Sequence, residues 1–395
     1  MMNRLSDKWL GGVFCGWLGL FWLSYWVGAP VPAVVGNRAL ASFPDKSVDP
    51  FSSAWLQKVS AWGIDHSPFR FRTLVERNQV LLKAAKALQP IPVCPGNSEV
   101  AMGRDGWLFL MDEIPDNRTR REIEKMTANA VKIARDVTAS GRRFFLMPVP
   151  DKSSVYPDYK GTLMRWADNQ PLREQSWAMM DHGFINAPDV HDSYQPLWEV
   201  YARARQKTPD LLYWEQDTHW NANGMLVALP QLLERLQPGV WDAQAVHPDG
   251  MDDHYCDLSL SFLLQSGTSS RPKYRLARAI PEKVESFTLP AFGYAAINRY
   301  RSTEPRSVKG RTLIITDSFL DGATPLFAPW FEDVTFAHFS CTGSPELAER
   351  ISQCDTLVFT SVERYLRWRL SVWGTHRRDY LLKALSVHPT TPAKP

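Results

Sequence analysis

The sequence predicts an α/β protein, with a three-layer α/β/α domain built on a mostly parallel sheet and one transmembrane helix before it. Two observations predict this arrangement. From about residue 120 onward, short apolar runs alternate with amphipathic stretches, a pattern typical of a parallel sheet covered by helices on both faces. Near the N-terminus, WLGGVFCGWLGLFWLSYWVGA (residues 9–29) carries no charge and supplies about 20 apolar residues, enough to cross a bilayer.

The charges around the apolar segment predict its orientation. Arg4 and Lys8 precede it, so residues 1–8 are expected in the cytoplasm, residues 9–29 in the membrane and the rest of the chain outside. A cleaved signal peptide is the alternative, with Val31–Ala33 as a weak cleavage site. The apolar stretch is longer than an ordinary signal-peptide core, which favours a retained anchor.

Composition narrows the possible partners and the compartment. The 395 residues include 45 Lys and Arg against 42 Asp and Glu, and a net charge of +3 does not indicate a nucleic-acid partner. Outside the apolar segment four cysteines remain. An oxidising compartment would allow the pairs Cys94–Cys256 and Cys341–Cys354, with free thiols as the alternative.

The remaining elements follow in chain order. Residues 30–95 read as an extended lead and a helical region, residues 96–385 as the α/β domain and residues 386–395 as a disordered tail. Gly141 ends the first helix of the domain and Asn221 caps a later one, which Pro230 interrupts or restarts. In the domain we expect helices at 121–140, 196–206 and 345–353, and strands at 143–149, 211–214, 312–316, 333–339 and 356–360.

Two expected strands end on polar residues at the edge of the sheet where ligands bind. Asp151 follows the first strand, and Ser318 follows the strand in RTLIITDSFLDG. A serine hydroxyl becomes a nucleophile only when a base removes its proton and a third group orients that base. Asp217 and His219 fit those roles, because residues i and i+2 of an extended segment point to the same side.

The same residues also fit roles outside nucleophilic catalysis. Asp317 and Ser318 could simply cap the next helix. Asp217 and His219 could instead be zinc ligands, with His182 and His191 upstream as further ligands. Their spacing is not diagnostic, and the chain has no CxxC or Cys/His zinc pattern. We therefore expect neither a metal nor another cofactor.

Six motifs in order carry a family resemblance. They are WGIDHSPFRFR (62–72), GRDGWLFL (103–110), MPVPDKSSVYPD (147–158), DTHWNANG (217–224), ITDSFLDG (315–322) and VERYL (362–366). With the N-terminal apolar segment, the chain resembles the AlgJ/AlgX-type alginate O-acetylation proteins of the SGNH hydrolase-like superfamily. The chain ends soon after VERYL, without room for a C-terminal carbohydrate-binding module, so the AlgJ type is the more similar.

The resemblance implies an SGNH hydrolase-like α/β/α fold and an Asp217–His219–Ser318 triad. The serine block reads Thr316-Asp317-Ser318 where SGNH enzymes usually have Gly-Asp-Ser. It also implies transfer of acetyl groups to hydroxyls of an exported polysaccharide, beside a membrane-bound O-acyltransferase that supplies them. The implied location is a bacterial inner membrane, with the catalytic domain in the periplasm.

Further residues are candidates for contacts with the substrate. Besides the backbone N–H of Ser318, an oxyanion hole needs a second donor, for which Tyr156, Asn221 and Arg364 are candidates. Lys152 could contact an acidic sugar or only form a salt bridge. Trp220 and Trp107 could stack on a sugar or belong to the core. Two rival functions use the same sequence features: a polysaccharide acetylesterase, and a non-catalytic glycan-binding scaffold.

Overall fold

A computed structural model describes residues 34–35, 38–39, 41–45, 52–66, 100–113, 119–161, 170–259, 268–289, 295–320 and 322–387, with a few single positions before residue 81. The predicted anchor at residues 9–29 lies almost entirely outside these ranges and stays a prediction. Among the helices that are described, none has both the length and the apolar character needed to cross a membrane. Residues 388–395 also lie outside them.

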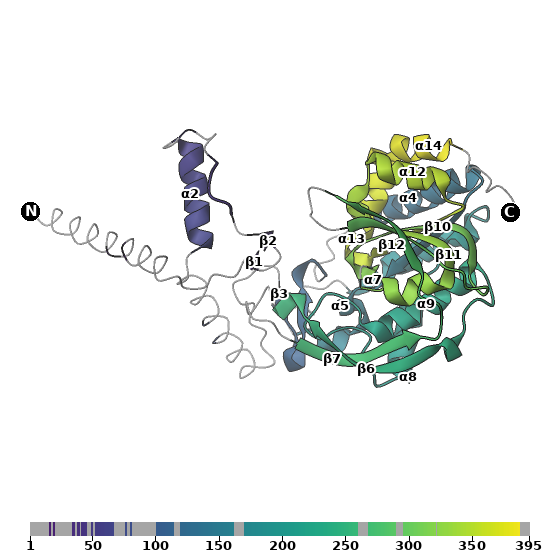
Figure 1. Cartoon of the computed structure of the whole chain (residues 1–395), viewed down its shortest axis with the longest axis horizontal. Helices are drawn as coiled ribbons and strands as arrows, with labels where there is room; N and C mark the ends of the chain where they lie inside the picture. Colours follow the sequence, from purple (N-terminus) through teal and green to yellow (C-terminus); the bar gives the residue numbers. More distant parts are fainter. Residues whose placement is uncertain are drawn as a thin grey trace, which may run out of the picture.

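The domain is organised around a six-stranded mixed sheet with the order β5-β12-β10-β11-β9-β8. The first four strands are parallel to one another, whereas β9 and β8 are antiparallel additions at one edge. The four strands that the sequence predicts in this sheet, β5, β10, β11 and β12, are thus parallel (Figure 1). The bounds of its strands are β5 Arg143–Val149, β12 Thr356–Val362, β10 Val308–Thr316, β11 Phe331–His338, β9 Ala295–Arg301 and β8 Glu282–Thr288.

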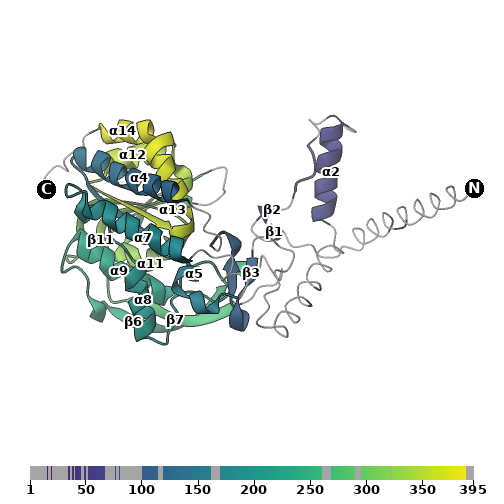
Figure 2. The same cartoon turned by 180° about the vertical axis from the view of Figure 1, so that it is seen from behind.

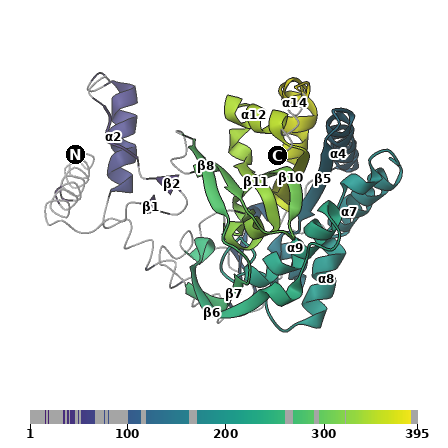
Figure 3. The same ribbon diagram turned by 45° about the vertical axis from the view of Figure 1, so that its right-hand side comes forward.

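Helices cover both faces of the sheet, as a parallel sheet requires. One face carries α4, α7, α12, α13 and α14, and the other carries α8, α9 and α11. Figure 3 shows α4, α12 and α14 on one side of the strands and α8 and α9 on the other. Helices α4 and α7 lie side by side when the molecule is seen from behind (Figure 2). Their bounds are α4 Arg120–Ala139, α7 Gln170–Ile185, α8 Trp198–Lys207, α9 Ala222–Leu236, α11 Thr324–Phe327, α12 Pro345–Gln353, α13 Glu363–Ser371 and α14 Arg378–Leu385.

The strand β5 shows how the sequence produces the two-sided core. Phe145 and Met147 pack into the hydrophobic core on the α9 face, and Phe144 and Leu146 pack into the core on the α4 face. This alternation follows from the two-residue period of a strand. An uninterrupted apolar run is thus buried on both sides.

Several sequence-based expectations are confirmed at the level of single elements. The helix α12 and the strand β5 have the expected bounds, and α4 differs by one residue at each end. Thr119 and Glu122 form a capping box at the start of α4, and Gly141 adopts a φ of 83° after its end. Asn221 caps α9, where its side chain accepts from the N–H groups of Asn223 and Gly224.

Two expectations about secondary structure are wrong. Residues 211–214 are not a strand of the sheet: they form one arm of a tight loop, in which Tyr213 makes an isolated bridge with Trp220. Pro230 does not interrupt α9, which runs continuously through it. The stripe formed by Leu229, Leu232 and Leu233 is fully buried, and its packing outweighs the hydrogen bond that a proline removes.

The antiparallel parts of the domain were not expected. The strands β6 (Val246–Tyr255) and β7 (Thr268–Leu276) form a separate two-stranded sheet, and β3 (Val100–Met102) and β4 (Leu108–Leu110) form another. The sequences VHPDGMDDHY and TSSRPKYRL contain few apolar residues, so they give no buried-strand signal. A further helix, α2, spans Ser53–Asp65, inside the helical region expected before the domain.

The expected disulfide Cys341–Cys354 is wrong. Both cysteines are buried free thiols, and so is Cys256, whose expected partner Cys94 lies outside the described residues. Burial raises the pKa of Cys341 to about 11 and that of Cys354 to about 12. These two side chains behave as small apolar groups, Cys341 in the turn before α12 and Cys354 at its C-cap.

The start of α9 is packed tightly against the loop before it, and this close approach predicts a sensitive position. A Cβ atom on Gly224 would lie 2.3 Å from the carbonyl oxygen of Leu212. We expect Gly224→Ala to lower the free energy of unfolding by about 1–3 kcal/mol, because the backbone must shift to admit the methyl group. Gly322→Ala is the matched control, since its Cβ would meet only the end of the Met225 side chain at 4.0 Å. Urea unfolding of both variants measures the effect, and equal midpoints would contradict it.

Candidate active site

The carboxyl ends of the three neighbouring strands β5, β12 and β10 meet at one edge of the sheet. Asp151 follows β5, Glu363 and Arg364 follow β12, and Asp317 and Ser318 follow β10. Because the strands are parallel and hydrogen-bonded in the order β5-β12-β10, their polar ends converge. The loop that carries Asp217 and His219 comes directly before α9 and reaches the same edge, where His219 contacts Ser318.

Ser318 is exposed, and its hydroxyl does not cap a helix. Its Oγ lies 2.9 Å from Nε2 of His219. The neighbouring Asp317 is buried and fixes the turn instead: its carboxylate accepts from the backbone N–H groups of Phe319 and Val362 and pairs with Arg369. Burial would raise the pKa of Asp317, but the charge of Arg369 and these hydrogen bonds lower it. Asp317 is thus a structural anchor for the exposed serine.

His219 connects the serine to a buried carboxylate. With Nδ1 protonated, the ring donates to Oδ1 of Asp217 at 2.7 Å, and the backbone N–H of His219 donates to the same oxygen at 2.8 Å. This tautomer leaves Nε2 free to accept from the hydroxyl of Ser318. The three side chains therefore form one hydrogen-bond chain from Asp217 through His219 to Ser318.

The environment of Asp217 stabilises its negative charge. Burial would raise its pKa, but hydrogen bonds from His219 and His254, the charge of His219 and the N–H of Asp257 lower it strongly. Burial would conversely lower the pKa of His219, whereas the hydrogen bond to Asp217 and the charges of Asp217 and Asp257 raise it. The pair thus favours an ionised carboxylate beside an imidazole of increased basicity.

Two residues of this site were missed in the sequence, and both come from the end of β6. His254 donates from Nε2 to Oδ2 of Asp217 at 3.0 Å, and the N–H of Asp257 donates to the same oxygen at 2.7 Å. The Asp257 side chain accepts from the N–H and the hydroxyl of Thr218. No local pattern marks β6 as part of the site. The one available signal is HYCD (residues 254–257), in which a histidine and an aspartate lie three residues apart.

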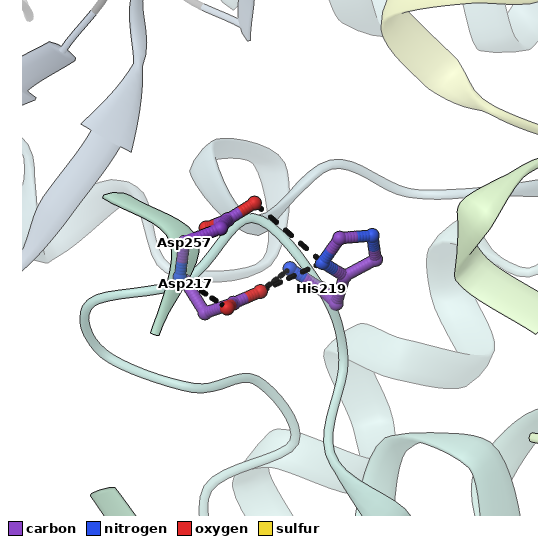
Figure 4. A group of neighbouring side chains, drawn as sticks. All are labelled: Asp217, His219 and Asp257. Carbon is purple, nitrogen blue, oxygen red and sulfur yellow. Dashed lines mark hydrogen bonds and ion pairs between the residues drawn. The ribbon is translucent and has the colours of Figure 1, made fainter. Parts of the chain in front are cut away.

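The alternative of a metal site has a partial basis in the geometry. Asp217, His219 and Asp257 place one ligand atom each within 4.8 Å of one another (Figure 4), whereas His182 and His191 are not part of this group. Each oxygen of Asp217, however, already accepts two N–H donors, and Nδ1 of His219 faces a carboxylate. This arrangement suits the stabilisation of a protonated imidazole better than the coordination of a cation.

Lys152 and Trp220 lock the two loops together and are not placed to contact a sugar. The buried Nζ of Lys152 donates to the carbonyl oxygens of Trp214, Glu215 and Asp217 at 3.3, 3.2 and 2.5 Å. Trp220 is fully buried, and its Nε1 donates to the carbonyl oxygen of Phe319 at 2.7 Å. Burial and these hydrogen bonds favour the structural alternatives, in which Lys152 binds protein groups and Trp220 belongs to the core.

Three other candidates also have structural partners. Trp107 is buried and stacks on Tyr159 at 4.3 Å between ring centroids. The hydroxyl of Tyr156 accepts from the N–H of Leu212, and the side-chain amide of Asn221 donates to Leu211. Trp107, Tyr156 and Asn221 therefore support the loop rather than face the nucleophile.

Arg364 remains a candidate for contact with reacting groups. Its guanidinium pairs with Asp151 at 2.5 Å and lies over the ring of Phe319, the residue after the nucleophile, at 5.4 Å. Its positive charge also acts on His219, where it opposes protonation. Burial, together with Glu113 and Glu363, raises the pKa of Asp151 to about 8, although Arg364 opposes this rise. A buried group of charges thus underlies the nucleophile.

A cavity of about 770 Å³ opens next to the nucleophile loop. Thr316 and Leu320, on either side of Ser318 in the chain, contribute to its wall. Its other residues combine aromatic and polar side chains, among them Tyr274, Tyr300, Phe336, Asn298, Arg278 and His338. Cavities of this size and mixed lining are typical of small-ligand sites.

Comparison with known proteins agrees with the expected family. The chain is 25% identical over 129 residues to "Probable alginate O-acetylase AlgJ" of Pseudomonas aeruginosa, an alignment that covers 33% of this chain and 31% of that protein. The protein of the same name from Pseudomonas putida is 27% identical over 140 residues, with 35% and 34% covered. The alignments thus span about a third of the length of these relatives.

A solved structure shows that the fold is shared. "Structure of Bacillus cereus PatB1 with sulfonyl adduct" superimposes with a TM-score of 0.50 and 12% identity, over 68% of this chain and 94% of that one. Asp217 and His219 lie inside the segment that matches a known family, and Ser318 lies beyond it. Residues 100–249 of this chain match the family of SGNH hydrolase-like domains of the acetyltransferase AlgX, which confirms the resemblance to the AlgJ/AlgX type.

Proposed function

We propose that this protein is a polysaccharide O-acetyltransferase that works through an acetyl-serine on Ser318. The observation that carries the proposal is the hydrogen-bond chain from the buried carboxylate of Asp217, through His219, to the exposed hydroxyl of Ser318. The relatives named as alginate O-acetylases support an acetyl group as the group transferred and a polysaccharide as the acceptor.

The first step forms the acetyl-enzyme. Nε2 of His219 takes the hydroxyl proton as Oγ of Ser318 attacks the acetyl carbonyl carbon, and the leaving group departs with that proton. Asp217 stabilises the imidazolium that exists in between. The negative oxygen of the tetrahedral intermediate needs donors, for which we propose the N–H of Ser318 and the guanidinium of Arg364. Loss of one such donor costs about 3 kcal/mol in the barrier.

The second step transfers the acetyl group to the sugar. His219 removes the proton of a sugar hydroxyl, whose oxygen attacks the acetyl carbonyl carbon, and Ser318 leaves and recovers a proton from His219. Water can replace the sugar in this step, because Ser318 is exposed. Acetylesterase activity is therefore the second candidate function. A non-catalytic scaffold would not need the three side chains to be aligned.

The location and the partners belong to the proposal as well. We expect residues 9–29 to anchor the chain in the inner membrane, with the catalytic domain in the periplasm. A membrane-bound O-acyltransferase would supply the acetyl group. The support is the uncharged apolar segment after Arg4 and Lys8, together with the family.

The nucleophile can be tested directly. We expect Ser318→Ala to lose acetate release from a chromogenic acetyl ester and acetyl transfer to added oligosaccharides by at least three orders of magnitude. Mass spectrometry of the wild-type protein after a brief exposure to the ester should find one acetyl group on Ser318. Acetate release without acetylated sugar would favour the esterase, and an active Ser318→Ala variant would contradict the proposal.

The base can be tested through the dependence on pH. His219 must be neutral to accept the proton, so activity should fall as the pH drops through its raised pKa, with a midpoint above the ordinary histidine value of about 6.5. Asp217→Asn removes the charge that raises this pKa. We expect kcat about three to four orders of magnitude lower and a midpoint at lower pH, measured as pH–rate profiles of both proteins. An unchanged midpoint would show that Asp217 does not act on the base.

The cavity next to the nucleophile loop is our proposed site for the acceptor sugar. Asn298→Trp should fill part of it and raise the KM for an oligosaccharide acceptor on the order of tenfold, since a blocked subsite loses about 1.4 kcal/mol or more of binding. Asn298→Ala, which leaves the cavity open, is the matched control. Transfer kinetics with varied acceptor measure the effect; equal KM values for the two variants would place the acceptor elsewhere.

A further inference from the structure

A second histidine contacts the carboxylate that orients the base. We infer that His254 is a positioning residue for the proposed acyl transfer, and that its imidazole fixes the orientation of the Asp217 carboxylate. The inference rests on the proposed function, because it assigns a role within that same site. With Nε2 protonated, His254 donates to Oδ2 of Asp217 at 3.0 Å.

The ring of His254 is held in place from two directions. It stacks on Trp214 with 4.7 Å between ring centroids and 18° between planes. Its backbone lies in β6, where His254 pairs with Ser269 of β7. The carbonyl oxygen of Trp214 in turn accepts from the buried Lys152. The donor is therefore presented by a fixed strand and a fixed ring.

The two oxygens of Asp217 serve different partners. Oδ1 accepts both donors of His219, the ring Nδ1 and the backbone N–H. Oδ2 accepts from His254 and from the N–H of Asp257, which both belong to the end of the β6–β7 hairpin. A carboxylate held only at Oδ1 can rotate about its Cβ–Cγ bond. Donors from a separate part of the chain prevent this rotation, and they thereby fix the plane in which His219 lies.

His254 also affects the charge of the site. Each donor to Oδ2 stabilises the Asp217 anion and weakens its attraction for the proton on His219. Without the His254 donor, His219 should keep its proton to higher pH. Among the described residues, other charged or ionisable groups near this contact or acting on His219 are Asp257 after β6, Lys152 behind Asp217, Arg364, the thiol of Cys256, and Arg271 of β7 with its partner Glu215.

Two substitutions of His254 separate the effect of its hydrogen-bond donor from the effect of its aromatic ring. His254→Phe keeps an aromatic ring against Trp214 but has no donor, and His254→Gln keeps an N–H donor but has no ring. His247→Phe is the matched control, because His247 lies on the same strand and has no contact with Asp217 among the described residues. The measurements are the titration of His219 by NMR of labelled histidines, and kcat and KM for a chromogenic acetyl ester across pH.

We expect His254→Phe to raise the midpoint of the His219 titration by roughly 0.5 pH and to lower kcat about tenfold with little change in KM. His254→Gln should recover most of kcat, and His247→Phe should match the wild type. If His254→Phe does not fold, His254→Ala provides the donor-free variant at this partly exposed position.

Two results would overturn the inference. In the first, His254→Phe has the same midpoint and kcat as His247→Phe. In the second, the Phe and Gln variants lose kcat equally while the midpoint stays unchanged, which is the result of a packing role alone. Ser318→Ala, assayed in parallel, keeps this test separate from that of the proposed function. If Ser318→Ala were active, the proposed function would fail, and the His219 titration would still decide the role of His254.

Discussion

The buried carboxylate of Asp217 is the constraint on which the rest of the site depends. A buried carboxylate that lacks partners takes up a proton, because burial penalises its charged form. Here each of its two oxygens accepts two N–H donors, and these hydrogen bonds stabilise the charge. Two of the donors come from His219 and two from the end of β6. The residues at the start of α9 and the β6–β7 hairpin must therefore assemble together for this charge to be stable.

The same logic explains why the loops around the nucleophile contain so many buried polar side chains. Lys152 satisfies three carbonyl oxygens of the loop before His219, Trp220 joins that loop to the residue after Ser318, and Asp317 joins the serine turn to the end of β12. None of these groups needs to touch a substrate. The backbone of these loops lacks the regular hydrogen bonds of a helix or sheet, and the buried side chains hold it rigid instead. The rigid loops keep Nε2 of His219 and Oγ of Ser318 in position for proton transfer.

The sequence predicts the parallel part of the fold well, because β5, β10, β11 and β12 each contain a run of residues that is buried on both faces and is largely apolar. It also predicts Asp217, His219 and Ser318, since their chemistry requires those residue types after a strand or in an extended turn. It does not predict His254 or Asp257, which contact Asp217 from a polar hairpin without hydrophobic periodicity. The sequence predicts Asn221 as the cap of α9, but it leaves the roles of Lys152 and Trp220 open, because their hydrogen bonds are to carbonyl groups that no local pattern reveals.

Ser318 is exposed and its base His219 is only half-buried, which affects the choice between transfer and hydrolysis in the proposed reaction. A polymer cannot enter a closed pocket, so a serine that modifies a polysaccharide must lie at the surface, where water also reaches it. Selectivity for the sugar then cannot come from exclusion of water before binding. In the proposed reaction it would come from the acceptor itself, which would displace water from the nucleophile loop when it occupies its proposed site in the neighbouring cavity. The partition between the two reactions would then depend on acceptor binding and not on the residues of the hydrogen-bond chain.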